Sequence, residues 1–225
     1  MSLPTPRAIL FDWDNTLVDS WGTIHEALNF LMRAMEKPEW TLAETREKVR
    51  LSLREAFPLH FGERWEKARD IYLERFRAIH LERLTALPGR EIMLRGLHEH
   101  GIYLGVVSNK TGGLLRREVA QLGWAELFGS VVGAGDAPID KPASDPVHLA
   151  LKPSGVAAGG DVWFVGDTAV DMECALASGC VPVRLGDDAG PDEFRHFPPQ
   201  LSFTDHETLF HAAKGLRFGD SSPSS

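Results

Sequence analysis

Five short apolar runs, each ending in polar or glycine residues, recur along the chain. They lie at residues 8–11 (AILF), 102–107 (IYLGVV), 131–132 (VV), 162–165 (VWFV) and 181–185 (VPVRL). Short continuous apolar runs are typical of strands that are buried on both faces. Since helical patterns separate these runs, they predict a parallel sheet with helices packed on both of its faces.

Two of the intervening segments carry a clear helical stripe. Apolar residues recur at helical spacing from Thr111 to about Leu122, and again from about Thr168 to near Gly179. Strands that alternate with helices in this order are typical of an α/β fold. We therefore expect a doubly wound, parallel (Rossmann-like) sheet as the core of the protein.

The chain between about Trp21 and Ala86 shows helical patterns without a strand pattern. Helices are predicted over residues 21–35, 46–57 and 65–79. An all-helical block that follows the first strand of a sheet domain does not fit easily into the layers of that sheet. We therefore expect it to form a separate, inserted all-helical cap domain.

Local signals mark the boundaries within this segment. Thr41 and Glu44 form a capping box ahead of the second predicted helix. Pro58 and the pair Pro88-Gly89 are predicted to mark breaks between elements of the segment. Polar Pro and Ser residues at the C-terminus predict disorder. The expected division is an α/β catalytic core over 1–19 and 87–218, a helical cap over 20–86, and a disordered tail over 219–225.

Composition and charge narrow the functional classes. The 225 residues are 43% hydrophobic and 25% charged, as in ordinary globular proteins. A net charge of -8 and the lack of a basic block oppose binding to nucleic acid or to an anionic membrane. Cys174 and Cys180 form no disulfide pattern, and no stretch is apolar enough for a signal peptide or a membrane span. The expected location is the cytoplasm, and the oligomeric state is left open.

Polar side chains follow four of the predicted strands. Open α/β sheets bind their ligands at the carboxyl ends of the strands, so these side chains are expected at one edge of the sheet. A single Asp-x-Asp after an apolar run is a weak signal, because Asp and Asn are common in turns. The candidates are Asp12 and Asp14 after the first strand, Ser108 and Asn109 after the second, Lys141 after the third, and Asp167 with Asp171 after the fourth.

This set of side chains matches the requirements of phosphoryl transfer. A hard cation such as Mg²⁺ needs oxygen ligands, which Asp12, the Asp14 backbone oxygen and Asp167 could supply. A phosphate needs donors and positive charge, which Ser108 and Lys141 could supply. A carboxylate can act as nucleophile while a neighbouring acid serves the leaving oxygen and then the attacking water. Asp12 and Asp14 fit these two tasks.

Four motifs, FDWDNTLVDS, VVSNK, DKP and VGDTAVD, occur in this order, with the helical segment after the first. Together they resemble the four motifs of the haloacid dehalogenase superfamily, and most closely its phosphoglycolate-phosphatase-like branch, from Arg7 to about Leu185. The resemblance implies a Mg²⁺-dependent phosphatase that works through an aspartyl-phosphate. Its substrate would be a small phosphorylated metabolite, such as phosphoglycolate, a sugar phosphate or a nucleotide. The acid at Asp14 disfavours dehalogenation.

The resemblance also implies a role for each matching residue. Asp12 would be the nucleophile and Asp14 the general acid/base. The transferring phosphoryl group would be held by Ser108 and Lys141, and we expect Asn109 to contact the substrate as well. The metal would be bound by Asp12, the Asp14 carbonyl and Asp167, with Asp171 as an outer or water-mediated partner.

Two residues depart from the family pattern. Trp13 stands where a smaller aliphatic residue is usual, and Asn15 replaces the commoner glycine. We therefore expect the shape of the loop around the nucleophile to differ from that of the family. Neither departure changes the charged residues of the motif.

Simpler interpretations stand beside several of these roles. Asp167 could cap the helix that follows it, and Asp171 could be a solvated acid of its first turn. Lys110 is expected at the surface. Arg46, Arg50 and Arg54 form one basic row on a predicted helix, and such rows are usually solvated. The sharper hypothesis is that Arg50 or Arg54 binds an anionic group of the substrate.

Two alternative functions remain open. A phosphomutase would use the same core but return the phosphoryl group to its substrate. A signalling receiver domain also has a doubly wound sheet, a phospho-accepting Asp and a Lys. Its acceptor lies on a later strand and it has no helical insertion, so motif order and length oppose that alternative.

Overall fold

The computed structural model describes residues 5–49, 51–186 and 192–215. These residues form a six-stranded sheet in the order β5-β4-β1-β6-β7-β8, and each neighbouring pair is parallel. The predicted α/β class with a parallel, doubly wound sheet is therefore confirmed. The strands are β1 Ala8–Phe11, β4 Tyr103–Thr111, β5 Ser130–Ala134, β6 Val162–Gly166, β7 Val181–Leu185 and β8 Leu201–Phe203.

Each of the five predicted apolar runs forms a strand. The sixth strand, β8, was not predicted, because its sequence LSF is short and only partly buried at the edge of the sheet. In β1, Ile9 and Phe11 face one side of the sheet, whereas Ala8 and Leu10 face the other. Both sides are apolar because helices cover both, and this explains the continuous apolar run.

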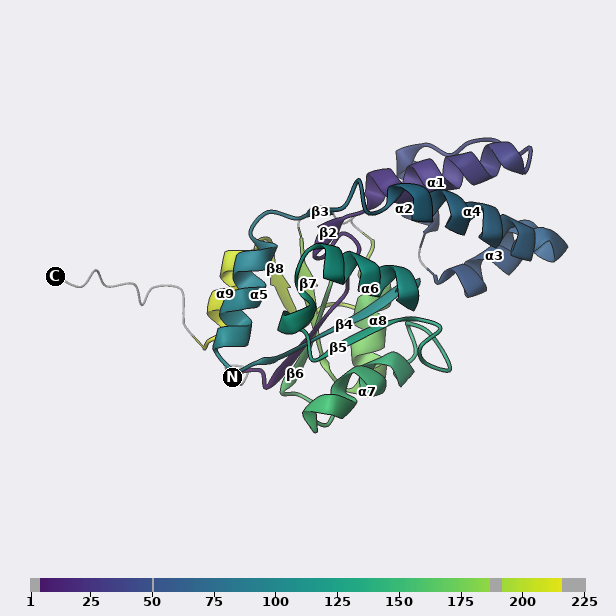
Figure 1. The fold of residues 1–225 in the computed structure, drawn as a ribbon. Helices are drawn as coiled ribbons and strands as arrows, with labels where there is room; N and C mark the ends of the chain where they lie inside the picture. The colour runs from purple at the N-terminus through teal and green to yellow at the C-terminus, as the bar shows by residue number, and fades with distance from the viewer. Residues whose placement is uncertain (1–4, 50, 187–191, 216–225) are drawn as a thin grey trace.

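Two layers of helices enclose the sheet (Figure 1). Helices α5, α6 and α9 pack on the face of Ile9 and Phe11, and α7 and α8 pack on the opposite face. Cys174 and Cys180 are free thiols within the second layer, as expected for small buried groups. The helices of the two layers are α5 Arg90–Glu99, α6 Gly112–Gln121, α7 Asp145–Leu151, α8 Ala169–Ser178 and α9 His206–Ala213.

The direction in which successive strands are added to the sheet reverses at β1. From β1 the chain builds β4 and β5 on one side, and it then returns to build β6, β7 and β8 on the other side. The loops after β1, β4 and β6 therefore separate at one edge of the sheet and leave room for a ligand. All the acidic and basic motifs of the core follow these strands or β5.

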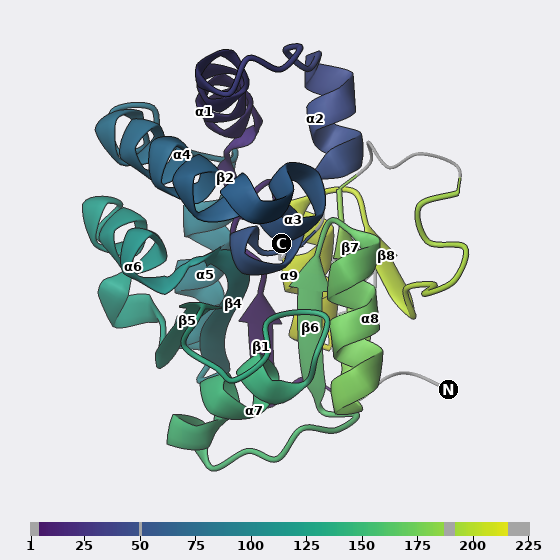
Figure 2. The ribbon, with the colours of Figure 1, turned by 90° about the vertical axis from the view of Figure 1, so that its right-hand side faces the viewer.

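A group of four helices stands at this edge of the sheet. Figure 2 shows them above the end toward which the arrowheads of β1 and β6 point. They share an apolar core of their own, which includes Leu28, Leu31, Phe57 and Phe76. These helices are α1 Trp21–Ala34, α2 Leu42–Lys48, α3 Leu53–Phe61 and α4 Trp65–Ile79. The exact domain limits given above remain predictions, and the predicted tail lies outside the described residues.

The second predicted helix of this group is divided in the structure. The capping box of Thr41 and Glu44 is present, but it begins the short helix α2, and a new helix, α3, starts after the extended residue Ser52. Pro58 lies inside α3 and does not end it. Because Val49, Leu51 and Ser52 are not helical, the predicted basic row is not continuous: Arg46 and Arg54 belong to different helices.

Two short strands join the helical group to the sheet domain. Val18 and Asp19 of β2 pair antiparallel with Ala86 and Thr85 of β3 (Thr85–Ala86). This pairing holds the two segments that connect the helical group to the sheet domain side by side. None of the helices that the structure describes has both the length and the apolar character needed to cross a bilayer.

Candidate active site

The predicted site residues of the core line one cavity of about 130 Å³. It lies between the carboxyl ends of β1, β4 and β6 and the helical group. The polar residues around it come from segments that are far apart in the sequence. They are Asp12, Asp14, Asn15, Ser108, Asn109, Lys110, Thr111, Lys141, Asp167, Thr168 and Asp171.

Lys141 connects two of the carboxylates. Its Nζ lies 2.6 Å from Asp12 Oδ1 and 2.7 Å from Asp171 Oδ1. Burial lowers the pKa of the Lys141 ammonium, but the attraction of Asp12 and Asp171 outweighs it, and the net pKa is raised. Lys141 therefore stays charged and holds both acids in place.

Asp12, Asp167 and Asp171 form an acidic cluster in which one carboxylate oxygen of each lies within 4.8 Å of the others. Burial, together with the negative charge of Asp171 and Asp14, raises the pKa of Asp12 to about 7 despite Lys141. Burial and the same kind of repulsion raise the pKa of Asp167 well above its usual range. One lysine does not offset this much negative charge.

The cluster fits a hard divalent cation. It offers carboxylate oxygens from the end of β1, from the residue after β6 and from the first turn of α8, and oxygen ligands are those that Mg²⁺ and Ca²⁺ prefer. Burial, and after it the repulsion between these carboxylates, raises the pKa of Asp12 and of Asp167, and a cation between them would offset both effects. The choice among divalent ions stays a prediction.

Neighbouring hydroxyl groups orient two of these acids. Thr16 Oγ1 donates to Asp167 Oδ1 at 2.8 Å. Thr168 caps α8, and both its N–H and its Oγ1 donate to Asp171 Oδ2, at 3.0 and 2.8 Å. Asp171 is therefore not the solvated first-turn acid of the simpler interpretation: it is 1% exposed and serves the cap as well as Lys141.

Gly166 makes this close packing possible. A Cβ on Gly166 would stand 2.3 Å from Cγ of Asp171, which no side chain could tolerate without moving the carboxylate. Glycine before the acidic loop thus lets Asp171 approach the end of β6. This close approach explains why a glycine precedes Asp167 in the fourth motif.

A second buried network holds Asp14. Lys110 Nζ lies 2.6 Å from Asp14 Oδ1 and 2.6 Å from Glu118 Oε2. The expectation that Lys110 is exposed is wrong, since its side chain is 5% exposed. Burial lowers the pKa of Lys110, but Asp14 and Glu118 outweigh this effect and the net pKa is raised.

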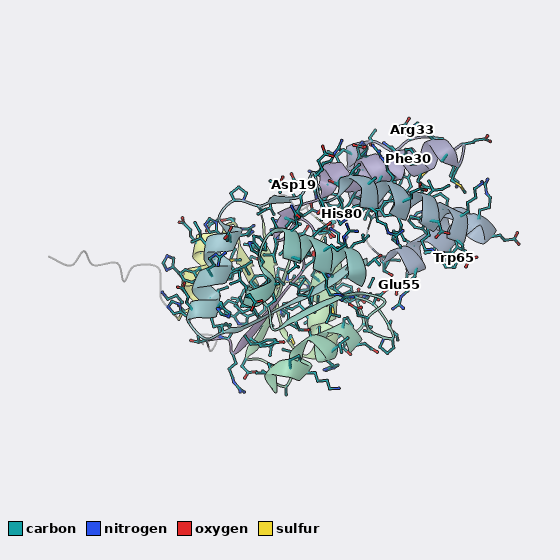
Figure 3. All side chains as sticks on the ribbon, viewed as in Figure 1. Asp19, Phe30, Arg33, Glu55, Trp65 and His80 are labelled. Carbon is teal, nitrogen blue, oxygen red and sulfur yellow. The ribbon has the colours of Figure 1, made fainter. Side chains whose placement is uncertain are left out.

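Glu118 of α6 is the centre of this network. Its Oε2 also accepts from Trp13 Nε1 at 2.7 Å, and its Oε1 lies 2.7 Å from His80 Nδ1. Burial raises the pKa of Glu118, but these hydrogen bonds and the charge of Lys110 together outweigh burial, so the net pKa is lowered. His80 stands where the helical group meets the core (Figure 3) and stacks on Phe76 of α4. Sequence reasoning found no role for Glu118 or His80, and missed Thr16 as well.

The loop after β1 keeps a backbone shape that glycine favours. Asn15 has φ +64°, in the left-handed region that Asn tolerates better than most residues. Its Oδ1 accepts from the N–H of Ser20 at 3.2 Å. Trp13 is fully buried against Trp124. The two departures from the family pattern are thus accommodated locally.

Ser108 and Asn109 take different positions in the site. Ser108 lines the cavity, is 5% exposed and accepts from the N–H of Lys110 at 3.2 Å. Asn109 Nδ2 donates to the carbonyl oxygen of Lys141 at 3.1 Å, so Asn109 ties the second motif to the third. Its Oδ1 is buried and has no hydrogen-bond partner.

The structure places Arg54 away from the cavity. Its Nε lies 2.5 Å from Asp140 Oδ2, and Nη2 lies 3.2 Å from the carbonyl oxygen of Pro138. Arg54 therefore joins α3 to the loop before Lys141, which differs from the predicted contact with substrate. The other predicted cap residue, Arg50, lies outside the described residues.

The wall of the cavity that the helical group contributes is apolar. It is supplied by α1, α4, the start of α3 and residues 49 and 51 ahead of it, with one leucine from α6. The residues are Trp21, Ile24, Val49, Leu51, Leu53, Tyr72, Leu73, Phe76 and Leu114. The side of the cavity formed by the core is therefore charged, and we call it the floor. The side formed by the residues just listed is apolar, and we call it the roof.

Comparisons with known proteins agree with this geometry. The family described as haloacid dehalogenase-like hydrolase matches residues 9–184. The phosphoglycolate phosphatase of Xanthomonas campestris pv. campestris (strain 8004) is 32% identical over 210 residues, which cover 87% of this chain and 95% of that protein. The phosphoglycolate phosphatase of Xylella fastidiosa (strain 9a5c) is 30% identical over 178 residues, 77% of each chain.

Solved structures show the same fold. A HAD-superfamily hydrolase from Ehrlichia chaffeensis has 26% identity and a TM-score of 0.64, over 96% of this chain and 99% of that one. A haloacid dehalogenase-like family protein from Streptococcus pneumoniae has a TM-score of 0.80 at 21% identity, over 91% and 97%. The family match spans more than half of the chain and includes all four motifs. The chain therefore belongs to the haloacid dehalogenase-like hydrolase family, and it is an enzyme.

Proposed function

We propose that this chain, a phosphoric monoester hydrolase of the haloacid dehalogenase type, hydrolyses small phosphomonoesters through an aspartyl-phosphate on Asp12, with Mg²⁺ as its cofactor. One observation carries the proposal: Asp12, Asp14, Ser108, Lys141 and Asp167 line a single cavity. Phosphoglycolate, for which the Xanthomonas relative is named, is the first substrate to assay. Sugar phosphates and nucleotides come next.

Asp12 supplies the nucleophilic oxygen. Its backbone N–H donates to the carbonyl oxygen of Val165 at 2.8 Å, which fixes the residue at the end of β1, and Lys141 holds Oδ1. When bound by Asp12, Asp167 and the Asp14 carbonyl, Mg²⁺ supplies the positive charge that offsets the carboxylates and the phosphate. The carboxylate of Asp12 attacks phosphorus and forms the acyl phosphate as the ester oxygen departs.

Asp14 transfers the proton in both half-reactions. As the acid, it gives its proton to the departing alcohol oxygen. As the carboxylate, it then takes a proton from the water that attacks phosphorus and releases phosphate, which returns Asp12 to its carboxylate form. The bond from Lys110 keeps one oxygen of Asp14 fixed while the other serves the substrate.

Ser108 and Lys141 hold the transferring phosphoryl group, and Asn109 positions the Lys141 backbone. Charged donors in a site that excludes water stabilise the additional charge of the transition state. The helical segment 20–86 acts as a cap that covers this site and keeps water from the nucleophile before transfer. The paired strands β2 and β3 form its two connections to the core.

The proposal is tested with Asp12→Asn and with Asp19→Asn as the matched control. Asp19 is exposed on β2 and does not line the cavity. Asp12→Asn is expected to keep the fold and lose at least about a thousandfold in phosphate release, whereas Asp19→Asn keeps full activity. Mg²⁺-dependent turnover by Asp12→Asn near the native rate would reject the nucleophile. Conversion of a substrate into an isomeric phosphomonoester, with activation by a bisphosphate and little free phosphate, would favour the phosphomutase alternative.

A further inference from the structure

The apolar roof lies where the leaving group of a bound substrate must go. The carboxylates and lysines form the floor of the cavity, so a phosphoryl group held there directs the rest of the molecule toward the helical group. Tyr72, Leu73 and Phe76 of α4 line that side together with Trp21 and Ile24 of α1. Such a surface gains free energy by contact with apolar atoms and offers little to a charged group.

The positive charges of the cavity are already committed. Among the lining residues that the structure describes, the cationic side chains are Lys110 and Lys141, against the carboxylates of Asp12, Asp14, Asp167 and Asp171. Each lysine is bonded to two carboxylates. A divalent cation and a phosphate dianion offset each other, so the site stays negative with substrate bound. Among the lining residues that the structure describes, a second anionic group on the substrate would find only these paired lysines, and burying it there is costly.

A second, smaller cavity continues the apolar surface. It has a volume of about 40 Å³ and shares with the first cavity the residues Ile24, Val49, Leu51, Leu53 and Tyr72. Behind them it reaches the core of the helical group, among Leu28, Phe57 and Phe61. Lys48, which is paired with Glu44, and His60 also line it. The shared residues therefore stand between two adjoining spaces.

We propose that the substrate of this enzyme has an uncharged, apolar leaving group, an aliphatic or aromatic alcohol, and that Leu53, Tyr72 and Phe76 select it. The inference rests on the proposed function, because the apolar roof faces a leaving group only if a phosphoryl group occupies the floor. It deepens that function by excluding a carboxylate such as that of phosphoglycolate from the preferred substrate.

The test compares three primary phosphomonoesters with the same CH₂–O–P linkage. In isobutyl phosphate an isopropyl group replaces the carboxylate of phosphoglycolate, with methyl groups in place of its two oxygens, and in benzyl phosphate a phenyl ring replaces it. Isobutyl phosphate is expected to exceed phosphoglycolate in kcat/KM by about tenfold or more, and benzyl phosphate by more, since each buried methylene contributes about three- to fourfold. The corresponding phosphonates, titrated calorimetrically into the Mg²⁺-loaded native enzyme, should bind in the same order.

Leu53→Arg places a cation in the roof, and Leu59→Arg is its matched control. Both residues belong to α3, but Leu53 lines the two cavities, whereas Leu59 is 76% exposed and lines neither. Leu53→Arg should lower kcat/KM for benzyl phosphate at least tenfold and raise that for phosphoglycolate. Leu59→Arg should change neither.

Each other outcome has a distinct meaning. A native enzyme that prefers phosphoglycolate, together with an Arg50→Ala variant that loses that preference, would overturn this inference and leave the phosphatase intact. A preference for phosphoglycolate without an effect of Arg50→Ala would overturn it as well. Failure of the native enzyme to release phosphate from any of the three esters, with Asp12→Asn indistinguishable from it, would reject the proposed function itself.

Discussion

Lys110 is bonded to Asp14, the residue assigned to proton transfer: its Nζ lies 2.6 Å from Asp14 Oδ1 inside the protein. The same ammonium is bonded to Glu118, so one lysine contacts both an acid of the cavity and an acid of helix α6. Asp14 therefore has a fixed orientation before any substrate arrives, and this orientation depends on a residue outside the cavity, Glu118.

Replacing Lys110 should affect both turnover and stability. Lys110→Met leaves Glu118 buried with an uncompensated charge, which should cost about 3–5 kcal/mol of unfolding free energy. In the double variant with Glu118→Gln the charge is removed as well, so stability should recover. Asp14 remains unanchored in both, and kcat should fall about 10- to 100-fold with little change in KM. Urea unfolding and steady-state kinetics measure the two effects.

Lys67→Met is the control, because Lys67 is exposed on α4. It should leave both quantities unchanged. If the double variant regained native kcat along with its stability, Lys110 would have no part in positioning Asp14 and would be a structural lysine only.

The ion pair of Arg54 and Asp140 should act on all substrates alike. Because Arg54 bonds to the core loop before Lys141, Arg54→Ala should change KM for phosphoglycolate and for isobutyl phosphate by the same factor. A double-mutant cycle with Asp140→Asn should give a coupling of about 1 kcal/mol in stability for this partly exposed pair. Arg64→Ala, an exposed arginine of the same helical group, is the control. A KM effect confined to the anionic ester would restore the predicted contact with substrate.

Divalent cations should stabilise the folded protein. The carboxylates of Asp12, Asp167 and Asp171 lie close together, so Mg²⁺ should bind the native state and raise Tm. At a concentration of about 100 Kd the gain is about 2.7 kcal/mol. Thermal unfolding in EDTA and in Mg²⁺ measures it, and Asp167→Asn should remove most of the shift. Asp19→Asn should retain it. An equal shift in Asp167→Asn would place the cation elsewhere.

The cap at the N-terminus of α9 should make a contribution to the unfolding free energy that depends on pH. Asp205 Oδ1 accepts from the N–H of Thr208 at 2.8 Å, and this bond lowers the pKa of Asp205 below its usual 3.8. Because the folded-state pKa is the lower one, the stabilisation is complete above the unfolded value and is lost as pH falls through the folded value. Asp205→Ala should therefore cost about 1 kcal/mol at pH 7 and progressively less below pH 4.

Urea unfolding of both proteins between pH 7 and 3 gives this difference. Asp205→Asn keeps a capping oxygen without a charge, so it should keep much of the stability and lose its pH dependence. A cost of Asp205→Ala that stayed constant across the range would assign the effect to something other than the carboxylate.

Much of the core was predictable because its signals are local. The run AILF before Asp12 is apolar at each position since both of its faces are buried, and the same holds for VWFV before Asp167. Parallel strands bring their carboxyl ends to one edge, so the placement of Asp12, Lys141 and Asp167 around one cavity follows from the order of elements.

The sequence alone therefore determined the α/β class, the helical insertion and the edge of the sheet at which the acids gather, because these depend on periodicity and chain order. Only the tertiary structure decided which charges meet: Lys110 is buried against Glu118, Glu118 also bonds to His80, and Arg54 bonds to Asp140. These partners lie 8, 38 and 86 positions apart along the chain in their respective pairs. A charged side chain carries no local sign of whether it faces water or another charge, since that depends on the packing of elements remote in sequence.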